Sequence, residues 1–349
     1  MTESPIQDPT PLKHNYVPRN TVDREQEKES LSQAFSDGVN SQNLFVYGPR
    51  GTGKSHITHL TLEQLDDSIN KCYVPCSQHD TQYKALKQIY RGVANEKIGD
   101  GHHTSDLQRK VVEKTGAVDT VILLDDIDFL ISNDGDDLLY FLTRMETRSN
   151  TGIVLISSNH EDLRNRIEER TYSSLQPQRI GFEPYTAEQA YRILAERAGN
   201  TLKPKTLERA VLTYIASTTQ NISIGLTWLK HAAETADEKI TETHVEQVQE
   251  QAFEKYTGHL LSGFSEHHKL LYQSVQELNT EKDDIQTGEI YTRYEELCKT
   301  YKEDTLSKRR LSDFLKHLEL LDLIKAEYHY GGKKGKTREI NRVGPFYAN

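Results

Sequence analysis

The sequence predicts an α/β domain built on a parallel sheet, followed by a small all-helical domain and a C-terminal winged helix-turn-helix. Three observations support this prediction. Up to residue 183, short apolar runs alternate with helical patterns, as in a parallel sheet that helices cover on both faces. From residue 184 the pattern is helical. After residue 259, three helical segments precede a β-hairpin with a basic turn.

The first predicted strand leads into a phosphate-binding loop. A strand is expected at 43–47 and a helix at 55–65, and the loop between them fits the pattern G-x-x-x-x-G-K-[ST]. This geometry directs backbone N–H groups and a helix N-terminus at one point, where they hold a polyphosphate. We expect Lys54 to reach the β- and γ-phosphates and the Ser55 hydroxyl to bind Mg²⁺. The expected nucleotide-binding residues of the loop are Gly48, Pro49, Arg50, Gly51, Thr52, Gly53, Lys54 and Ser55.

Further strands and helices complete the predicted α/β domain. The strands are expected at 71–75, 118–125, 152–157 and 179–182, and the helices at 23–35, 80–93, 107–114 and 138–148. Residues 1–15 are rich in Pro, Ser and Thr and hold few apolar side chains, which predicts a flexible N-terminal tail.

Asp125 and Asp126 close the apolar strand predicted at 118–125. In parallel sheets the carboxyl end of such a strand lies beside the phosphate loop. We expect Asp125 to hold Mg²⁺, directly or through its water, and Asp126 to polarise the attacking water. The alternative is a plain acidic turn, which a phosphate loop about 70 residues upstream disfavours. Asn159 follows the next strand, where a carboxamide could reach the γ-phosphate or simply form a turn.

The remaining predicted elements belong to the two later domains. Helices are expected at 186–198, 206–216, 224–235 and 241–256 in the second domain, and at 266–278, 288–300 and 306–320 in the third. The strands of the terminal hairpin are expected at 324–330 and 337–343.

The helix predicted at 306–320 has two different faces. Its core stripe is formed by Leu311, Phe314, Leu315 and Leu318. The expected DNA-binding residues of the other face are Lys308, Arg309, Arg310, Ser312 and Lys316. A basic wing, predicted at the hairpin tip, carries Lys333, Lys334, Lys336 and Arg338, and such a wing can follow phosphates or enter the minor groove. The alternative is a winged helix used for protein contacts.

The charge of the chain is unevenly distributed. The net charge is −10, but residues 299–349 hold 12 basic and 7 acidic residues, so this end carries +5 and the rest −15. This distribution predicts one polyanion-binding end on an acidic body, with a solvated charged face as the alternative. Only three cysteines are present, and no apolar run approaches a membrane span or a signal peptide, so we expect a soluble, cytosolic protein without a disulfide scaffold.

Together these motifs resemble one known family, the archaeal origin-recognition and cell-division-control initiators, which are AAA+ proteins. The resemblance covers about residues 14–345. Besides the phosphate loop it includes Tyr16-Val17-Pro18, Asp23-Arg24-Glu25, Leu123-Leu124-Asp125-Asp126-Ile127-Asp128, Ser157-Ser158-Asn159, Arg170 with Ser173-Ser174, Phe182-Glu183-Pro184-Tyr185, Tyr294-Glu295-Glu296-Leu297-Cys298 and the segment 306–313.

The resemblance implies a domain organisation. Residues 1–15 would form the tail, 16–183 an AAA+ nucleotide-binding domain, 184–258 a helical lid and 259–349 a winged-helix DNA-binding domain. The helical insert specific to initiators would lie between Cys76 and Lys114.

The resemblance also implies residue roles. Val17 and Pro18 would line the adenine pocket, with Tyr185 nearby, and Asn159 would be the sensor-1 residue. Arg170 would be the arginine finger, which acts on the nucleotide of a neighbouring copy; spacing alone favours a solvated arginine on a charged helix.

Two departures from the family pattern concern hydrolysis. The second acid of the strand is usually Glu and is Asp126 here, which is shorter by one methylene. The sensor-2 arginine of the lid belongs near residues 220–226, where Ser223 stands and no arginine is found. The resemblance therefore implies ATP binding with slow hydrolysis.

The function implied is an ATP-dependent DNA replication initiator with ATP or ADP and Mg²⁺ as cofactors. It would bind double-stranded origin DNA and recruit or load the minichromosome-maintenance helicase, and it could self-associate on DNA. It would be located in the cytoplasm at the nucleoid, with no membrane partner. Two alternatives remain open. One is a clamp-loader or transposition-type ATPase, and the other is a nucleotide-switched transcription regulator.

Overall fold

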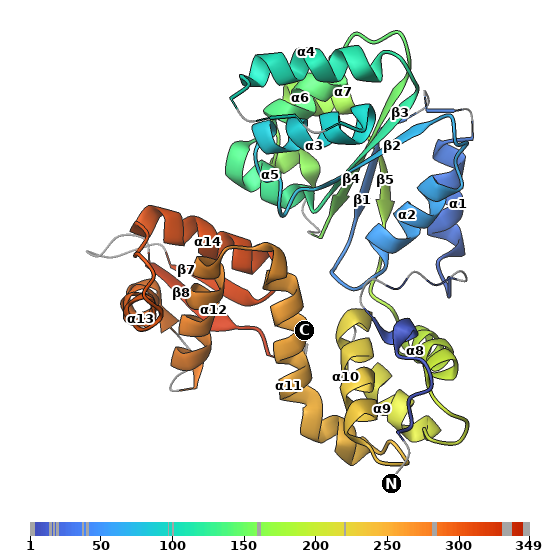
Figure 1. Cartoon of the computed structure of the whole chain (residues 1–349), viewed down its shortest axis with the longest axis vertical. Helices are drawn as coiled ribbons and strands as arrows, with labels where there is room; N and C mark the ends of the chain where they lie inside the picture. Colours follow the sequence, from blue (N-terminus) through green and yellow to red (C-terminus); the bar gives the residue numbers. More distant parts are fainter. Residues whose placement is uncertain are drawn as a thin grey trace. The chain divides into compact units, whose positions relative to one another are not determined.

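The computed structural model describes residues 4–13, 16, 18, 21–36, 38–39, 42–96, 98–99, 101–158, 162–219, 221–280, 285–329 and 337–344 (Figure 1). Its internal contacts divide the chain into two units. One unit holds residues 17–184, and the other holds residues 1–16 together with 185–349.

The first unit is built on a five-stranded sheet in the order β2-β3-β4-β1-β5, in which every pairing is parallel. The strands are β1 Leu44–Tyr47, β2 Asn70–Pro75, β3 Thr120–Asp125, β4 Thr151–Ser157 and β5 Gln178–Gly181. This arrangement confirms the predicted parallel α/β domain. The interior strand β3 is buried at every residue, which explains why its apolar run lacks alternation.

Helices cover both faces of this sheet (Figure 1). They are α1 Glu25–Ala34, α2 Lys54–Glu63, α3 Gln82–Ala94, α4 Thr104–Thr115, α5 Ile127–Asp134, α6 Asp137–Thr143 and α7 Glu169–Leu175, with the short helix η2 at Leu163–Asn165. Successive residues of β3 belong to two separate apolar clusters. Val121 packs in the cluster that contains residues of α1 and α2, and Ile122 in the cluster that contains residues of α3 to α6.

No range was predicted for the helices α5 and α7 of this unit. The chain turns directly from β3 into α5 through Asp126, whose φ of 52° is left-handed. Because Ile127, Phe129 and Leu130 are all buried, their apolar run carries no helical periodicity. The helix expected at 138–148 is in fact α6, which ends at Thr143.

The helical part of the second unit has a single apolar core around Trp228, which is fully buried. Its helices are α8 Ala187–Thr201, α9 Arg209–Thr218, α10 Ile222–Thr235 and α11 Glu242–Leu260, followed by the short helix η3 at Leu261–Gly263. A capping box joins Thr186 and Gln189 at the start of α8.

The N-terminal segment packs on these helices, so the prediction of a flexible tail is wrong for residues 4–13. The backbone N–H groups of Gln7 and Asp8 both donate to the Thr201 carbonyl, at 2.8 and 3.1 Å. Leu12, in the short helix η1 at Thr10–Leu12, is 2% exposed in the core of α8 to α10. The composition predicted disorder because it cannot show that a few apolar side chains have a docking surface elsewhere in the chain.

The C-terminal part of the second unit is a winged helix, which confirms the predicted three helices and hairpin (Figure 1). Its elements are α12 Glu266–Asn279, β6 Ile285–Gln286, α13 Thr287–Tyr301, α14 Lys308–Leu320, β7 Ile324–His329 and β8 Thr337–Arg342. The three strands form an antiparallel sheet in the order β6-β8-β7. The strand β6 was not predicted, because two residues are too few to show alternation. None of the helices in the described part of the chain could cross a membrane.

A buried pair of histidines joins α12 to α14. His268 and His317 are 5% and 6% exposed, and His268 Nε2 lies 3.1 Å from His317 Nδ1. The His268 ring also stacks on Phe314, with 3.6 Å between centroids. Burial, and then the neighbouring His317 and His267, lower the pKa of His268 to about 3.

We expect this histidine to destabilise the winged helix at mildly acidic pH. The ordinary pKa of 6.5 lies above the folded value of about 3, so below pH 6.5 the unfolded chain binds the additional proton. The free energy of unfolding should therefore fall by up to about 1.4 kcal/mol per pH unit between pH 6.5 and 3. Thermal unfolding of the wild type and His268→Gln at pH 7.5 and 5.5 measures this loss. Equal pH dependence in both proteins would contradict the assignment.

Candidate functional site

The phosphate loop has a backbone that only glycine allows. Gly48, Gly51 and Gly53 have φ values of 144°, 79° and 90°, and Gly53 leads directly into α2. A Cβ atom on Gly48 would lie 2.1 Å from the Phe182 carbonyl oxygen. The loop is therefore pressed against the end of β5, and its backbone is shaped to surround an anion at the start of a helix.

Lys54 places a buried cation in this loop. The residue is 5% exposed, and its Nζ donates to the carbonyls of Gly48 at 2.6 Å and Pro49 at 2.7 Å. Burial and the charge of Arg50 lower the pKa of Lys54 to about 8, while Asp126 and Asp125 act in the opposite sense. Burial destabilises the charged form of the ammonium, and a neighbouring polyanion would stabilise it. This environment therefore fits a polyphosphate group.

Asp125 lies opposite Ser55 at the end of β3. Ser55 Oγ and the backbone N–H of Asp126 each donate to Asp125 Oδ1 at 3.0 Å, and Tyr73 Oη donates to Oδ2 at 3.3 Å. Burial, and then Asp126, raise the pKa of Asp125 to about 6. A buried carboxylate beside a second carboxylate and a hydroxyl is a donor set that suits Mg²⁺. Tyr73 is a residue of this site that the sequence did not indicate.

Asp126 is connected to the phosphate loop. Its Oδ1 accepts from Arg50 Nη2 at 3.0 Å and from Ser158 Oγ at 3.4 Å. The Arg50 and Asp126 side chains are 13% and 24% exposed. The structure thus brings together Lys54, Ser55, Asp125 and Asp126 as the spacing predicted, and it adds Arg50 in a contact that the motif alone does not indicate.

A third acid, Asp128, was also missed. It is 3% exposed and accepts from Ser157 Oγ at 2.9 Å and from the backbone N–H of Ser158 at 3.0 Å. Arg166 forms an ion pair with the same carboxylate. These contacts anchor the end of β4 directly before Asn159. No local pattern indicated this role, because an acid at the start of a helix is ordinary.

The other predicted nucleotide-site residues belong to several different parts of the chain. Val17 and Asn159 lie outside the described residues, and Pro18 is buried in the first unit. Tyr185 is 8% exposed and packs in the apolar core of the second unit. Arg170, on α7, has a side chain that is 55% exposed and pairs with Glu168 at 2.6 Å. Its guanidinium also lies over the Tyr140 ring, 4.8 Å from the centroid.

Helix α14 separates its apolar and basic faces as predicted. Leu311, Leu315 and Leu318 are buried, and Phe314 is half-buried against His268. On the other face the side chains of Lys308, Arg309, Arg310 and Lys316 are exposed, and Ser312 is half-buried. The Ser307 side chain caps the helix by accepting from the Arg310 N–H, and the three consecutive cations of the first turn are exposed.

The predicted wing is only partly described. Lys333, Lys334 and Lys336 lie outside the described residues. The placement of Arg338 at the hairpin tip is wrong, because it lies in β8 opposite Tyr328. Its side chain is 10% exposed and pairs with Glu319 at 2.9 Å. Spacing could not show which way this strand residue points, and its guanidinium joins the hairpin to α14.

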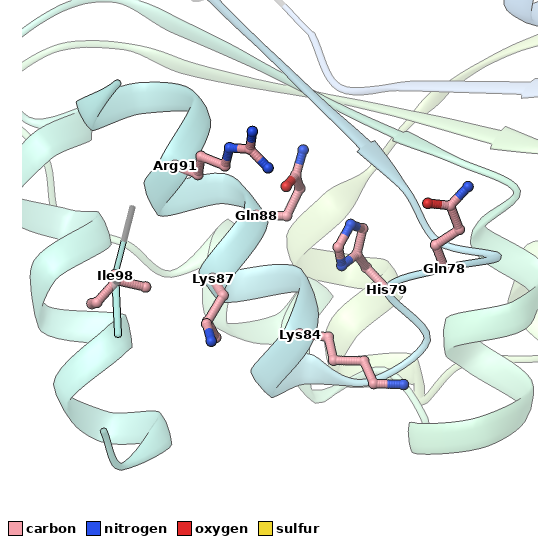
Figure 2. Close-up of a pocket in the computed structure, with 7 residues that line it drawn as sticks. All are labelled: Gln78, His79, Lys84, Lys87, Gln88, Arg91 and Ile98. Carbon is pink, nitrogen blue, oxygen red and sulfur yellow. The ribbon is translucent and has the colours of Figure 1, made fainter. Parts of the chain in front are cut away.

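A basic pocket of about 390 Å³ lies on the first unit beside α3 (Figure 2). Lys84, Lys87, Gln88 and Arg91 recur on one side of that helix at the spacing of a single face. The wall is completed by Gln78, His79 and Ile98. Lys84 is paired with Asp80 at 2.6 Å, whereas Arg91 is exposed. The pocket therefore presents positive charge at the surface of the first unit.

Comparison with known proteins agrees with this architecture. Residues 39–167 match the AAA domain family, and residues 259–343 match the CDC6, C terminal winged helix domain. The ORC1-type DNA replication protein of Pyrococcus abyssi is 30% identical over 363 residues, covering 96% of this chain and 87% of the relative. ORC1-type DNA replication protein 1 of Methanothermobacter thermautotrophicus is 28% identical, covering 97% and 94%.

Solved structures extend the comparison to three dimensions. The Aeropyrum pernix ORC1 protein, solved in complex with DNA, matches with a TM-score of 0.77 and 28% identity, over 98% of this chain and 95% of that one. Cdc6p from Pyrobaculum aerophilum shares the fold, with a TM-score of 0.64 and 19% identity over 97% and 95%. Because the sequence similarity spans nearly the whole chain and includes both domains, this protein belongs to the family of ORC1-type DNA replication proteins, the Orc/Cdc6 AAA+ initiators.

Proposed function

We propose that this chain is an ATP-dependent replication initiator that binds double-stranded origin DNA and recruits or loads the replicative minichromosome-maintenance helicase. One observation carries the proposal. The same chain holds a buried lysine in a phosphate loop and exposes three consecutive cations on the third helix of a winged helix. The Aeropyrum relative, which was solved with DNA, supports the DNA partner.

In this proposal the domain bounds follow the sequence prediction, apart from the docked N-terminal segment. Residues 16–183 form the AAA+ domain, 184–258 the lid and 259–349 the DNA-binding domain. ATP and Mg²⁺ would bind in the first of these. When bound, they supply a phosphoanhydride that can be hydrolysed and a cation that neutralises its charge.

Each residue of the proposed nucleotide site has a distinct role. The loop 48–55 holds the phosphates through its backbone, and Lys54 neutralises them. Ser55 and Asp125 hold Mg²⁺, and Asp126 orients water. The remaining proposed contacts are Asn159 at the γ-phosphate, Arg170 from a neighbouring copy, and Val17, Pro18 and Tyr185 around adenine. Slow hydrolysis is supported by the short side chain of Asp126 and by the absence of arginine from residues 220–226 of the sequence.

The proposed DNA surface has contributions from both units. In the winged helix it consists of Lys308, Arg309, Arg310, Ser312 and Lys316, with Lys333, Lys334 and Lys336 of the wing. We leave Arg338 out, since Glu319 neutralises it. In the AAA+ domain we add Lys87 and Arg91, which line the pocket beside α3 within the segment assigned to the initiator-specific insert. Binding to DNA would place the protein at the nucleoid in the cytoplasm, with self-association through Arg170.

The proposed function predicts which genomic fragments the purified protein captures with ATP and Mg²⁺. An initiator should enrich a small number of intergenic, repeat-containing loci, because specific sites bind typically about 10³-fold or more tighter than other DNA. Sequencing the captured fragments measures this. A broad set of promoters would favour a transcription regulator. Absence of any preference, together with rapid DNA-stimulated hydrolysis, would favour a clamp-loader or transposition-type ATPase.

A further inference from the structure

One ion pair joins the phosphate loop to the acid that is proposed to orient water. Arg50 Nη2 donates to Asp126 Oδ1 at 3.0 Å, and both side chains are largely shielded from solvent, at 13% and 24% exposure. Ser158 Oγ lies 3.4 Å from the same oxygen. Arg50 is one of the variable positions of the loop motif, so the motif does not require an arginine there.

The backbone around Asp126 limits how far its carboxylate can move. Its φ and ψ of 52° and 45° are left-handed, a conformation that is uncommon for residues with a Cβ atom and that Asp adopts more readily than most. Its N–H donates to Asp125 Oδ1 at 3.0 Å, and its carbonyl accepts from the Phe129 N–H at 3.1 Å. The backbone of Asp126 is thus held at both ends, and its carboxylate is held by Arg50 at 3.0 Å and Ser158 at 3.4 Å.

The two cations of the loop have different partners. Lys54 Nζ donates to loop carbonyls, at 2.6 and 2.7 Å, whereas the Arg50 guanidinium is bonded to Asp126. Removal of Arg50 would leave Lys54 in place to bind phosphate. Arg50 is thus positioned to affect Asp126 more than it affects nucleotide affinity.

A carboxylate that polarises water must accept a hydrogen bond from it with a free, electron-rich oxygen. A guanidinium on that oxygen occupies a lone pair and reduces its electron density through a charge-assisted hydrogen bond. We propose that Arg50 is a positioning residue that restrains Asp126, so that the chain retains its triphosphate for longer than an unrestrained acid would allow. This inference rests on the proposed function, in which Asp126 orients the attacking water.

The test compares Arg50→Gln with the wild type in single-turnover hydrolysis and in direct titration with a fluorescent ATP analogue. We expect Arg50→Gln to raise the rate at saturating ATP by about fivefold or more, a change of about 1 kcal/mol in the barrier. The Kd should change by less than the rate does, since Lys54 remains. Arg50→Lys, which keeps a charge that can reach Asp126, should lie close to the wild type.

If Arg50 acts by restraining Asp126, its effect on the hydrolysis rate should require Asp126; a general loosening of the loop would not. In an Asp126→Asn background, Arg50→Gln should leave the residual rate unchanged. Thermal unfolding without nucleotide gives an independent measurement. The shifts in Tm of Arg50→Gln and Asp126→Asn should not add in the double variant, because both remove the same ion pair.

Other results would contradict either the restraint of Asp126 by Arg50 or the proposed function as a whole. A slower or unchanged rate in Arg50→Gln, or additive shifts in Tm, overturns the restraint while leaving the proposed function intact. If the wild type binds no ATP analogue, the proposed function fails and the restraint fails with it. Lys54→Ala is the reference for lost binding in the same titration.

Discussion

Replacement of Lys54 by alanine is expected to weaken ATP binding strongly, with a Kd about 10- to 160-fold above that of the wild type. The side chain is buried and lies at the start of α2, within a loop whose glycines are shaped to surround phosphate. Its ammonium provides a charged hydrogen bond that water cannot replace in a shielded site, and hydrogen bonds of this kind contribute about 1.5–3 kcal/mol. Titration with a fluorescent ATP analogue measures the loss.

The same variant should retain its fold, which distinguishes a lost ligand contact from unfolding. Burial lowers the pKa of Lys54 to about 8, so holding this charge in the protein costs stability. We therefore expect the Tm without nucleotide to stay within about 4 °C of the wild type, which corresponds to about 1 kcal/mol. Lys114→Ala, in the last turn of α4, is the matched control and should alter neither quantity. Affinity within threefold of the wild type would contradict the role of Lys54.

The parts of this site that could be predicted from the sequence are those encoded in short segments. The loop 48–55 and the pair Asp125-Asp126 each sit at the end of a strand that its own composition identifies. Because the strands are parallel, their carboxyl ends meet at one edge of the sheet, and so do these residues. The two faces of α14 were predictable for the same reason, since a period of 3.6 residues assigns each side chain to a face.

Contacts between distant segments could not be predicted in this way. Tyr73 reaches Asp125 only because β2 pairs with β3 in a register that no local pattern encodes. The pairing of Arg338 with Glu319 depends on how the hairpin packs on α14. The N-terminal segment likewise gains its structure from α8, through carbonyl and side-chain partners about 190 residues away. In each case the missing information is tertiary packing.

Replacement of Arg309 and Arg310 by alanine is expected to weaken binding to duplex DNA by roughly 10- to 100-fold at about 0.1 M salt. Both residues are exposed in the first turn of α14, whose apolar side is buried against the rest of the winged helix. Their removal should therefore leave the Tm unchanged. Fluorescence anisotropy with labelled duplexes at several salt concentrations measures the affinity and its salt dependence together.

The salt dependence shows what the two arginines contact. Each phosphate contact contributes about 0.9 to the slope of log affinity against log salt, so two lost contacts should reduce the slope by about 1.8 for every sequence tested. If the arginines contact base edges instead, affinity falls mainly for the preferred sequence and the slope changes little. The matched control is Lys239→Ala with Lys255→Ala, which removes the same charge from exposed positions in the helical part of the second unit. If this control weakened binding equally, the effect would follow from net charge alone, and α14 would lose its assigned role.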